Sequence, residues 1–243
     1  NFSEDGKNVK LFNCNSQKVV LIAPIKNQCY EDYFYSKDLK YEEALGDLEE
    51  ISKQVIDKII KEDEIPSKKG ADYNAFLSFT AFQTFRTLYH ADQLNEIVDG
   101  IVKRMLKMQL DAKMNENITH EDIDKTSIAV KEPALMLLRQ IPFFIPLLYD
   151  LRCKLIINKS TLNFITSDNP VVLFNSYFKD KTVRALTGIA SKGFQAFFPL
   201  NERKCVVFYD DKIYKVGSKT NKPVETVSDE DILAINKLQL PDP

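Results

Sequence analysis

The spacing of apolar residues changes near residue 150, and this change constrains the fold most. Between about residues 40 and 150, apolar side chains recur three and four positions apart, which is the period of a helix with one buried face. After residue 150 they form short runs separated by turn-forming residues, which is typical of β-strands. A chain that is mainly helical first and mainly β afterwards is predicted to be an α+β protein.

The helical part divides at breaks in the apolar pattern. We expect helices over about 40–62, 72–91, 92–116 and 133–150, and a short helix that begins after Thr119. The third carries an apolar stripe made of Leu94, Ile97, Val98, Ile101, Met105 and Met108. The last is apolar nearly all round, which predicts a central, buried helix that its two prolines kink or end.

The remaining apolar runs predict strands. A β-hairpin is expected over 8–22, further strands over 153–157, 163–166, 171–174, 193–200, 204–210 and 212–216, and a final helix over 232–240. The predicted fold class is α+β, with an N-terminal β-hairpin, a central bundle of about four to five helices, a C-terminal antiparallel β-sheet and a final short helix. We expect a single domain over 1–243. Within it, 1–35 is the hairpin with the segment after it, 36–150 the helical part and 151–243 the mostly β part, where 175–192 is expected to be a mobile loop.

Charge and apolar content narrow the classes of partner. The 243 residues include 33 Lys and Arg against 35 Asp and Glu, a net charge of −2, so no excess of basic charge indicates an extended nucleic-acid surface. No apolar run reaches the length of a membrane span and no signal peptide is visible, which predicts a cytoplasmic protein with no membrane contact.

Four cysteines are scattered along the chain: Cys14, Cys29, Cys153 and Cys205. None forms a Cys-x-x-Cys pair, so the pattern argues against a structural zinc site and indicates buried thiols in a reducing compartment. His90 and His120 are the only histidines, and neither has the spacing of a metal ligand. The sequence therefore assigns no cofactor, although a divalent cation held by carboxylates stays an option.

The most distinctive local sequence is Thr166-Ser167-Asp168-Asn169-Pro170, between two apolar runs. Asp and Asn bond their own backbone in turns, and Pro170 disfavours helix at Asn169. Such a turn can present Ser167, Asp168 and Asn169 from a rigid sheet. We name Asp168 as a candidate catalytic residue, and Ser167 and Asn169 as candidate ligand-binding residues. The alternative is that Asp168 only accepts hydrogen bonds within its own turn.

A second candidate group lies on the predicted helix 72–91. Gln83 and Arg86 are three positions apart and so share one face, among aromatic neighbours. An arginine there pairs with a carboxylate or meets an anionic ligand. Glu49 is the partner that we predict, with Glu43 and Asp47 as alternatives. Our hypothesis is that Glu49, Arg86 and Asp168 converge on one cleft between helices and sheet as catalytic residues, with Gln83 as a ligand-binding residue.

Several segments, in order, resemble an uncharacterised family, the domain of unknown function 4238. They are Asn1-Phe2-Ser3 with Gly6-Lys7, Ala23 to Cys29 with Asp32 to Tyr35, Glu43 to Glu49, Gln83 to Thr87, Thr161 to Val172 and Phe198-Pro199-Leu200. The resemblance covers nearly the whole chain, but the family's opening His-Tyr-Val-Pro-Gln segment is missing here. It implies no established activity.

Three classes of function stay open. The first is a metal-dependent hydrolase acting on a nucleotide or nucleic acid, with Glu49 and Asp168 as ligands and Arg86 holding phosphate. The second is a non-catalytic module or sensor that binds a small molecule or a peptide. The third is a protein-interaction domain that binds through an aromatic surface. No paired-carboxylate motif supports a standard nuclease core.

Overall fold

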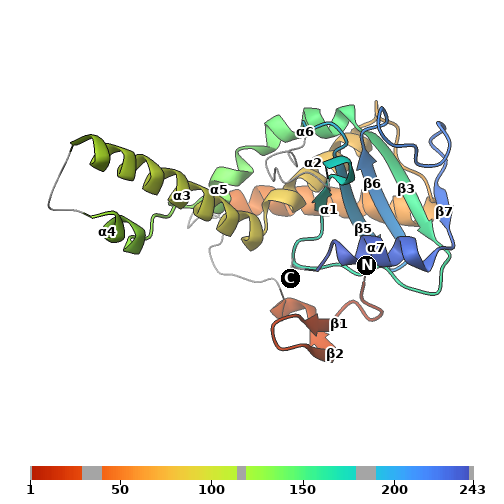
Figure 1. Cartoon of the computed structure of the whole chain (residues 1–243). Helices are drawn as coiled ribbons and strands as arrows, with labels where there is room; N and C mark the ends of the chain where they lie inside the picture. The colour runs from red at the N-terminus through yellow and green to blue at the C-terminus, as the bar shows by residue number, and fades with distance from the viewer. Residues whose placement is uncertain (1, 29–39, 114–118, 179–189, 241–243) are drawn as a thin grey trace.

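The structure is a computed structural model that describes residues 2–28, 40–113, 119–178 and 190–240. In its N-terminal and helical parts the elements are β1 (Asn8–Asn13), β2 (Lys18–Pro24), η1 (Ile25–Asn27), α1 (Lys40–Glu62), α2 (Ala71–Phe85), α3 (Leu88–Lys113), α4 (His120–Lys125), α5 (Pro133–Leu138) and α6 (Ile141–Asp150). They are followed by β3 (Arg152–Asn158), β4 (Val172–Phe174), η2 (Ser176–Phe178), β5 (Gln195–Asn201), β6 (Lys204–Tyr209), β7 (Val224–Thr226) and α7 (Asp229–Lys237). Figure 1 shows their arrangement.

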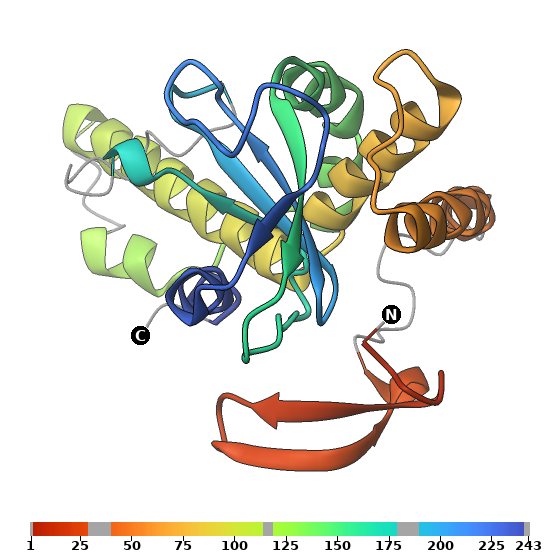
Figure 2. The ribbon, with the colours of Figure 1, turned by 90° about the vertical axis from the view of Figure 1, so that its right-hand side faces the viewer.

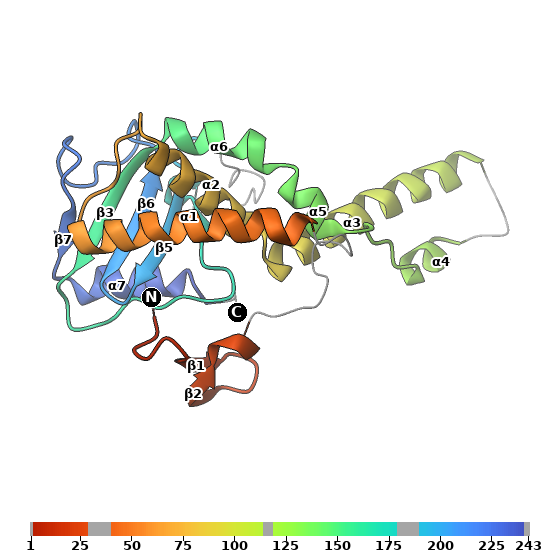
Figure 3. The ribbon, with the colours of Figure 1, turned by 180° about the vertical axis from the view of Figure 1, so that it is seen from behind.

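The predicted α+β fold class is confirmed. β1 and β2 form a separate antiparallel hairpin, and the other strands form one sheet in the order β4-β5-β6-β3-β7. All neighbours in this sheet are antiparallel except β3 and β7, which are parallel. Helices α1, α2 and α6 cover one face of the sheet, and α7 covers the other (Figures 2 and 3).

Both faces of the central strands are buried, because successive side chains of a strand point to opposite sides. On β6, Val206 and Phe208 pack under the three helices, whereas Cys205 and Val207 pack under α7. The ring of Phe76, on α2, stacks on Phe208 at 6.1 Å between centroids, and it stacks in the same way on a phenylalanine of β5. The main core therefore lies between the sheet and the helices α1, α2 and α6.

The expected helix over 72–91 is wrong at its end. α2 stops at Phe85, and a new helix, α3, begins at Leu88. The Thr87 hydroxyl accepts a hydrogen bond from the His90 backbone N–H at 3.4 Å, as an N-cap residue does. His90 therefore lies in the first turn of α3, where burial lowers the pKa of its imidazole.

The expected helix over 133–150 is also divided, into α5 and α6. Pro142 falls in the first turn of α6, where its missing N–H costs nothing. The prediction that this segment is central and buried is wrong. Of α6, only Phe144 and Leu148 are buried, and Phe143 is 73% exposed. A helix that is apolar on all sides can still lie at the surface of the protein, because many apolar residues remain exposed in folded proteins. Its periodicity does not show which side is exposed.

Two expected strands are absent from the described part of the chain. Residues 163–166 run beside α7, and Ile165 donates its backbone N–H to the Asn236 side chain instead of to a strand. Residues 212–216 form a turn in which the Tyr214 hydroxyl donates to Gly193 O at 3.0 Å and accepts from the Tyr177 N–H. The backbone N–H groups of Lys212, Ile213 and Tyr214 bond the side chain or the carbonyl of Asp210 instead of a neighbouring strand.

The strand β7 was not predicted. Two basic side chains of β3, Arg152 and Lys154, donate to backbone carbonyls of the loop that leads into β7. Lys154 is buried, which lowers the pKa of its amino group. These bonds position the loop so that β7 can pair with β3. The tip of the expected mobile loop over 175–192 lies outside the described residues.

Two parts of the chain project from this body. α3 extends away from the sheet, and α4 folds back along it (Figure 1). We call these two helices the arm. The β1–β2 hairpin lies apart from the sheet and its helices (Figure 2).

Candidate functional site

Glu49 and Arg86 form the ion pair that the sequence predicts. Glu49 lies on α1, and Arg86 directly follows α2, where its Nη1 donates to Glu49 Oε1. The guanidinium carbon also lies 5.1 Å from the centre of the Phe82 ring. The Arg86 side chain is 31% exposed and the Glu49 side chain is 48% exposed. A pair this exposed contributes about 0–1 kcal/mol, so it ties α1 to α2 without dominating stability.

Gln83 lies one turn before Arg86 and is half-buried. Its neighbours Thr80 and Thr84 both donate to carbonyls four residues earlier in α2, at 2.8 and 2.9 Å. No hydrogen bond to the Gln83 side chain is present among the described residues, so its ligand-binding role stays a prediction. The side chain of Glu43, an alternative partner for Arg86, lies outside the described residues.

The Ser-Asp-Asn-Pro turn is fixed by Gln239, which follows α7. Gln239 Oε1 accepts from the Ser167 hydroxyl at 2.9 Å and from the Ser167 N–H at 3.1 Å, and its Nε2 donates to Pro170 O. Within the turn, the Asn169 N–H donates to the Ser167 hydroxyl oxygen at 3.2 Å. Ser167 is therefore a structural anchor, and its hydroxyl has no histidine beside it within the described residues.

The preceding residues are held by the same helix. The carboxylate of Asp229, at the start of α7, accepts from the Thr161 N–H and hydroxyl at 2.9 and 2.7 Å. Asn236 donates to Asn163 O and accepts from the Ile165 N–H. We call residues 161–170 the anchored segment, because side chains of α7 and Gln239 bind it along its length.

Asp168 differs from its neighbours in this turn. Its side chain is exposed and has no hydrogen bond or ion pair among the described residues. Phe164 packs in the core under α7, whereas Val171 packs in the core under α1, α2 and α6. Asp168 therefore lies where the chain crosses from one face of the sheet to the other, beside the edge strand β4.

The structure brings Glu49 and Arg86 together, and no contact joins either one to Asp168 among the described residues. The hypothesis that the three converge on one cleft stays a prediction, as does the catalytic role of each residue. Over the same residues, no group of three His, Cys, Asp or Glu side chains is placed to hold a metal ion.

Three of the four cysteines are described, and they are free thiols. Cys153 and Cys205 are buried in the two cores, and burial raises the pKa of the Cys153 thiol to about 12. Cys205 shows the same effect, so both behave as small apolar residues rather than nucleophiles. Cys14 is exposed, and Cys29 lies outside the described residues.

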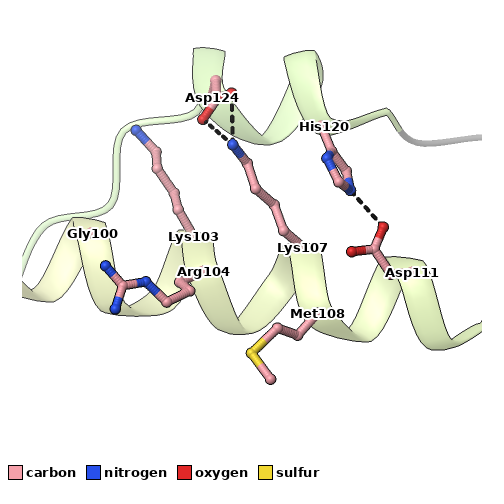
Figure 4. Close-up of a pocket in the computed structure, with 8 residues that line it drawn as sticks. All are labelled: Gly100, Lys103, Arg104, Lys107, Met108, Asp111, His120 and Asp124. Atoms are coloured by element: carbon pink, nitrogen blue, oxygen red, sulfur yellow. Dashed lines mark hydrogen bonds and ion pairs between the residues drawn. The ribbon is translucent and has the colours of Figure 1, made fainter.

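A groove that the sequence did not predict lies between α3 and α4 (Figure 4). It has a volume of about 480 Å³. An ion pair between Lys107 and Asp124, at 2.7 Å, and a hydrogen bond between Asp111 and His120, at 2.8 Å, bridge it. Lys103 pairs with Asp99 along α3. Because most of its charges are paired, the groove holds α4 on α3 rather than offering a free charged site. The sequence did indicate the start of α4, where Thr119 and Asp122 cap the helix by reciprocal hydrogen bonds.

Large apolar side chains are exposed on both the β1–β2 hairpin and the arm. On β2, Val19, Leu21 and Ile22 keep 65% to 72% of their exposure. The α3 stripe of Ile97, Ile101, Met105 and Met108 keeps 53% to 66%. The sequence identifies both runs as apolar, but only the structure shows that nothing in the described part of the chain covers them.

These features define an α+β protein with a docked C-terminal helix. They are the anchored segment, the Glu49–Arg86 pair and a sheet that is buried on both faces. The chain belongs to the family described as Protein of unknown function (DUF4238), whose family model matches residues 1–242. This confirms the resemblance noted in the sequence. No curated protein and no solved structure matches the chain. Among the described residues, no helix has the length and apolar character needed to cross a membrane.

Proposed function

We propose that this protein is a protein-interaction module, and that the β1–β2 hairpin binds an extended segment of another protein. One observation carries the proposal. Four consecutive apolar residues of β2, Val19 to Ile22, are exposed although they lie in a strand. Because strand side chains alternate, this run presents apolar surface on both faces of a two-stranded sheet.

The hairpin is a suitable surface for adding a strand. A two-stranded sheet has two open edges, and isolated hairpins are marginally stable in water until another strand or a helix packs on them. A third strand would pair with the backbone at an open edge and would contact the apolar side chains on both faces. Four lysines and two acidic residues lie in the hairpin or next to it in the sequence, and Lys10 pairs with Glu4; they are Lys7, Lys10, Lys18 and Lys26 with Glu4 and Asp5. The segment that fits is therefore apolar with acidic flanks.

A displayed library of random extended peptides tests this proposal. Peptides selected on the wild-type protein should be apolar in alternate positions, and their binding should fall by about tenfold or more in Leu21→Lys. The matched control is Ile51→Lys, which changes an exposed isoleucine of α1 in the body. Selected peptides that bind Leu21→Lys as tightly as the wild type would contradict the proposal.

The second candidate is the hydrolase or ligand site around Asp168. Its support is an exposed carboxylate without a partner among the described residues, on a turn that Gln239 fixes. Metal ligands and general bases are held in place in this way before substrate binds. The function would be a metal-dependent hydrolase acting on a nucleotide or nucleic acid, in which Arg86 would bind phosphate in place of Glu49.

Calorimetric titration with Mn²⁺ tests the second candidate. Binding that disappears in Asp168→Ala and persists in Asp211→Ala, another exposed carboxylate, would support it. Equal titration of both variants, or no heat with the wild type, would count against it. Arg86→Lys keeps the positive charge but loses the bidentate guanidinium donor. If this variant kept both its stability and its phosphate binding, Arg86 would not be part of the site.

A cytoplasmic location is part of this proposal. Its support is the pair of buried, free thiols, Cys153 and Cys205, which suit a reducing compartment.

A further inference from the structure

The loop that leads from β6 into β7 carries a concentration of positive charge. Its four lysines are exposed, and none of them pairs with a carboxylate among the described residues; they are Lys212, Lys215, Lys219 and Lys222. We call residues 212–222 the basic loop. Beneath it, Arg152 and Lys154 of β3 likewise have no carboxylate partner in the described part of the chain. A surface with this much uncompensated positive charge attracts anions.

The tip of the basic loop is closed at its base. Gly217 has a φ of +60°, and a Cβ at this position would come within 2.5 Å of the Val224 side chain. Glycine is therefore the residue that allows the chain to turn there and to pass close to Val224. Because the two ends of the tip are in contact, residues 218–223 form a compact turn in front of β3.

The carbonyl groups of this turn point towards β3. Arg152 donates to Lys219 O. Lys154 donates to Thr220 O and, at 3.0 Å, to Lys222 O. Arg152 and Lys154 are two positions apart on the strand, so both side chains leave the sheet on the same side. Two cations therefore hold the turn from one side.

The direction of these carbonyls sets the direction of two backbone N–H groups. In a trans peptide the C=O group and the N–H group that follows it point to opposite sides. The N–H groups of Thr220 and Asn221 therefore point away from β3, and neither has an acceptor among the described residues. Successive N–H groups that a turn presents on one side form an anion-binding concavity.

A hydroxyl donor lies beside these N–H groups. The Ser218 and Thr220 hydroxyl oxygens are 2.7 Å apart and share one hydrogen bond. Only one of the two hydroxyls donates in that bond, so the other keeps its proton for a ligand. Both residues are exposed.

Acidic residues confine the anion-binding surface to one end of the turn. Glu62, Asp63 and Glu64 line a groove of about 310 Å³ with Asn221, Lys222 and Pro223. Their negative charge disfavours an anion on the side of the turn that faces this groove. The side that carries Ser218, Lys219 and Thr220 does not line it.

We propose that the basic loop binds a phosphate group, either as inorganic phosphate or as part of a phosphate monoester. The N–H groups of Thr220 and Asn221 and one hydroxyl donate to the phosphate oxygens, and the Lys219 ammonium neutralises the charge. A phosphate dianion has enough acceptor oxygens for all of these donors at once. The loop lies at the end of the body opposite the arm (Figures 1 and 3). It shares no residue with the hairpin, Arg86 or Asp168, so the proposal is independent of the function proposed above.

Amide NMR spectra of the full, ¹⁵N-labelled chain during titration with inorganic phosphate test the proposal. The titration is made at an ionic strength of about 50 mM, where surface charges are weakly screened. The amide protons of Thr220 and Asn221 should move downfield and saturate, with a dissociation constant on the order of 1 mM for this exposed site. Sodium chloride at the same ionic strength should leave both signals in place.

Two variants separate the charge of the loop from its geometry. Lys219→Gln removes one exposed charge and should raise the dissociation constant by about threefold to tenfold. Lys53→Gln, which changes an exposed lysine of α1, is the matched control and should leave it unchanged. Lys154→Met keeps the length of the buried side chain but cannot hold two carbonyls, so the signals of Thr220 and Asn221 should stop responding to phosphate. If Lys154→Met fails to fold, the comparison of Lys219→Gln with Lys53→Gln still decides.

The absence of a shift at Thr220 and Asn221 beyond that in sodium chloride would overturn the proposal. Equal phosphate binding by Lys219→Gln and Lys53→Gln would also overturn it, as would a folded Lys154→Met variant with the full response. A parallel titration with glycerol phosphate distinguishes the two sources of the phosphate group. Tighter binding of glycerol phosphate would assign the site to a monoester, and tighter binding of inorganic phosphate would assign it to the free ion.

Discussion

The body and the arm use apolar residues in opposite ways. In the body, Phe76, Phe198 and Phe208 are buried, and the rings of Phe198 and Phe208 both stack on that of Phe76 between sheet and helices. On the arm, an apolar stripe is exposed, and polar contacts link α3 to α4, namely the Lys107–Asp124 ion pair and the hydrogen bond between Asp111 and His120. The comparison teaches that the body buries its large apolar side chains and so supplies stability, whereas the arm leaves its apolar stripe exposed in the described part of the chain.

Phe208→Ala should produce the largest loss of stability. The side chain is fully buried, so its removal leaves a cavity and should lower the free energy of unfolding by about 3–5 kcal/mol. Urea denaturation followed by circular dichroism measures the change. Phe143→Ala is the matched control, because that ring is 73% exposed and its loss should change stability by less than about 0.5 kcal/mol. Equal losses would mean that α6 is covered by a partner.

Gln239→Ala should have the next largest effect, because this side chain makes three hydrogen bonds to the anchored segment, two with Ser167 and one with Pro170. Ser167 would lose partners in a partly buried site, which costs about 1–3 kcal/mol. Asp168→Ala in the same turn removes no contact within the described residues and should be neutral. If Asp168→Ala destabilises the protein as much as Gln239→Ala, the carboxylate has a structural partner.

Two helix caps with the same chemistry, one in the body and one in the arm, allow the two regions to be compared. Ser228 caps α7 and Thr119 caps α4, each by accepting a backbone N–H with its hydroxyl. Ser228→Ala should lower the free energy of global unfolding by about 1 kcal/mol. Thr119→Ala should leave the global transition unchanged and increase hydrogen exchange only over 120–125. A global effect of Thr119→Ala would show that arm and body unfold together.

The smallest effect is expected at acid pH. Hydrogen bonds from Thr161 lower the pKa of Asp229, although the carboxylate is exposed. A lowered pKa in the folded state gives stability that is present above the ordinary value of about 3.9 and is lost as the pH falls through the folded pKa. The wild type should therefore lose more stability than Asp229→Asn between about pH 5 and pH 2. Identical acid transitions would show that the anchored segment does not depend on this charge.

The sequence predicted those features that depend on neighbouring residues. The helix over 40–62, the hairpin, the cap at Thr119 and the division into helical and β parts all follow from periodicity and local turn chemistry. The Glu49–Arg86 pair was also predicted, because an arginine among aromatic residues needs a carboxylate. The Ser-Asp-Asn-Pro turn was recognised, but its anchor, Gln239, lies 72 residues from Ser167 and could not be.

Long-range contacts decided the rest. Local spacing predicts a strand at 163–166, but α7 binds that backbone with side chains, and β7 forms because side chains of β3 hold the loop before it. Exposure is likewise a property of the assembled fold. By itself the sequence determined which residues are apolar and in which element they lie. Only the tertiary structure decided that those of α6 and α3 face outwards, because burial depends on which surfaces meet in space.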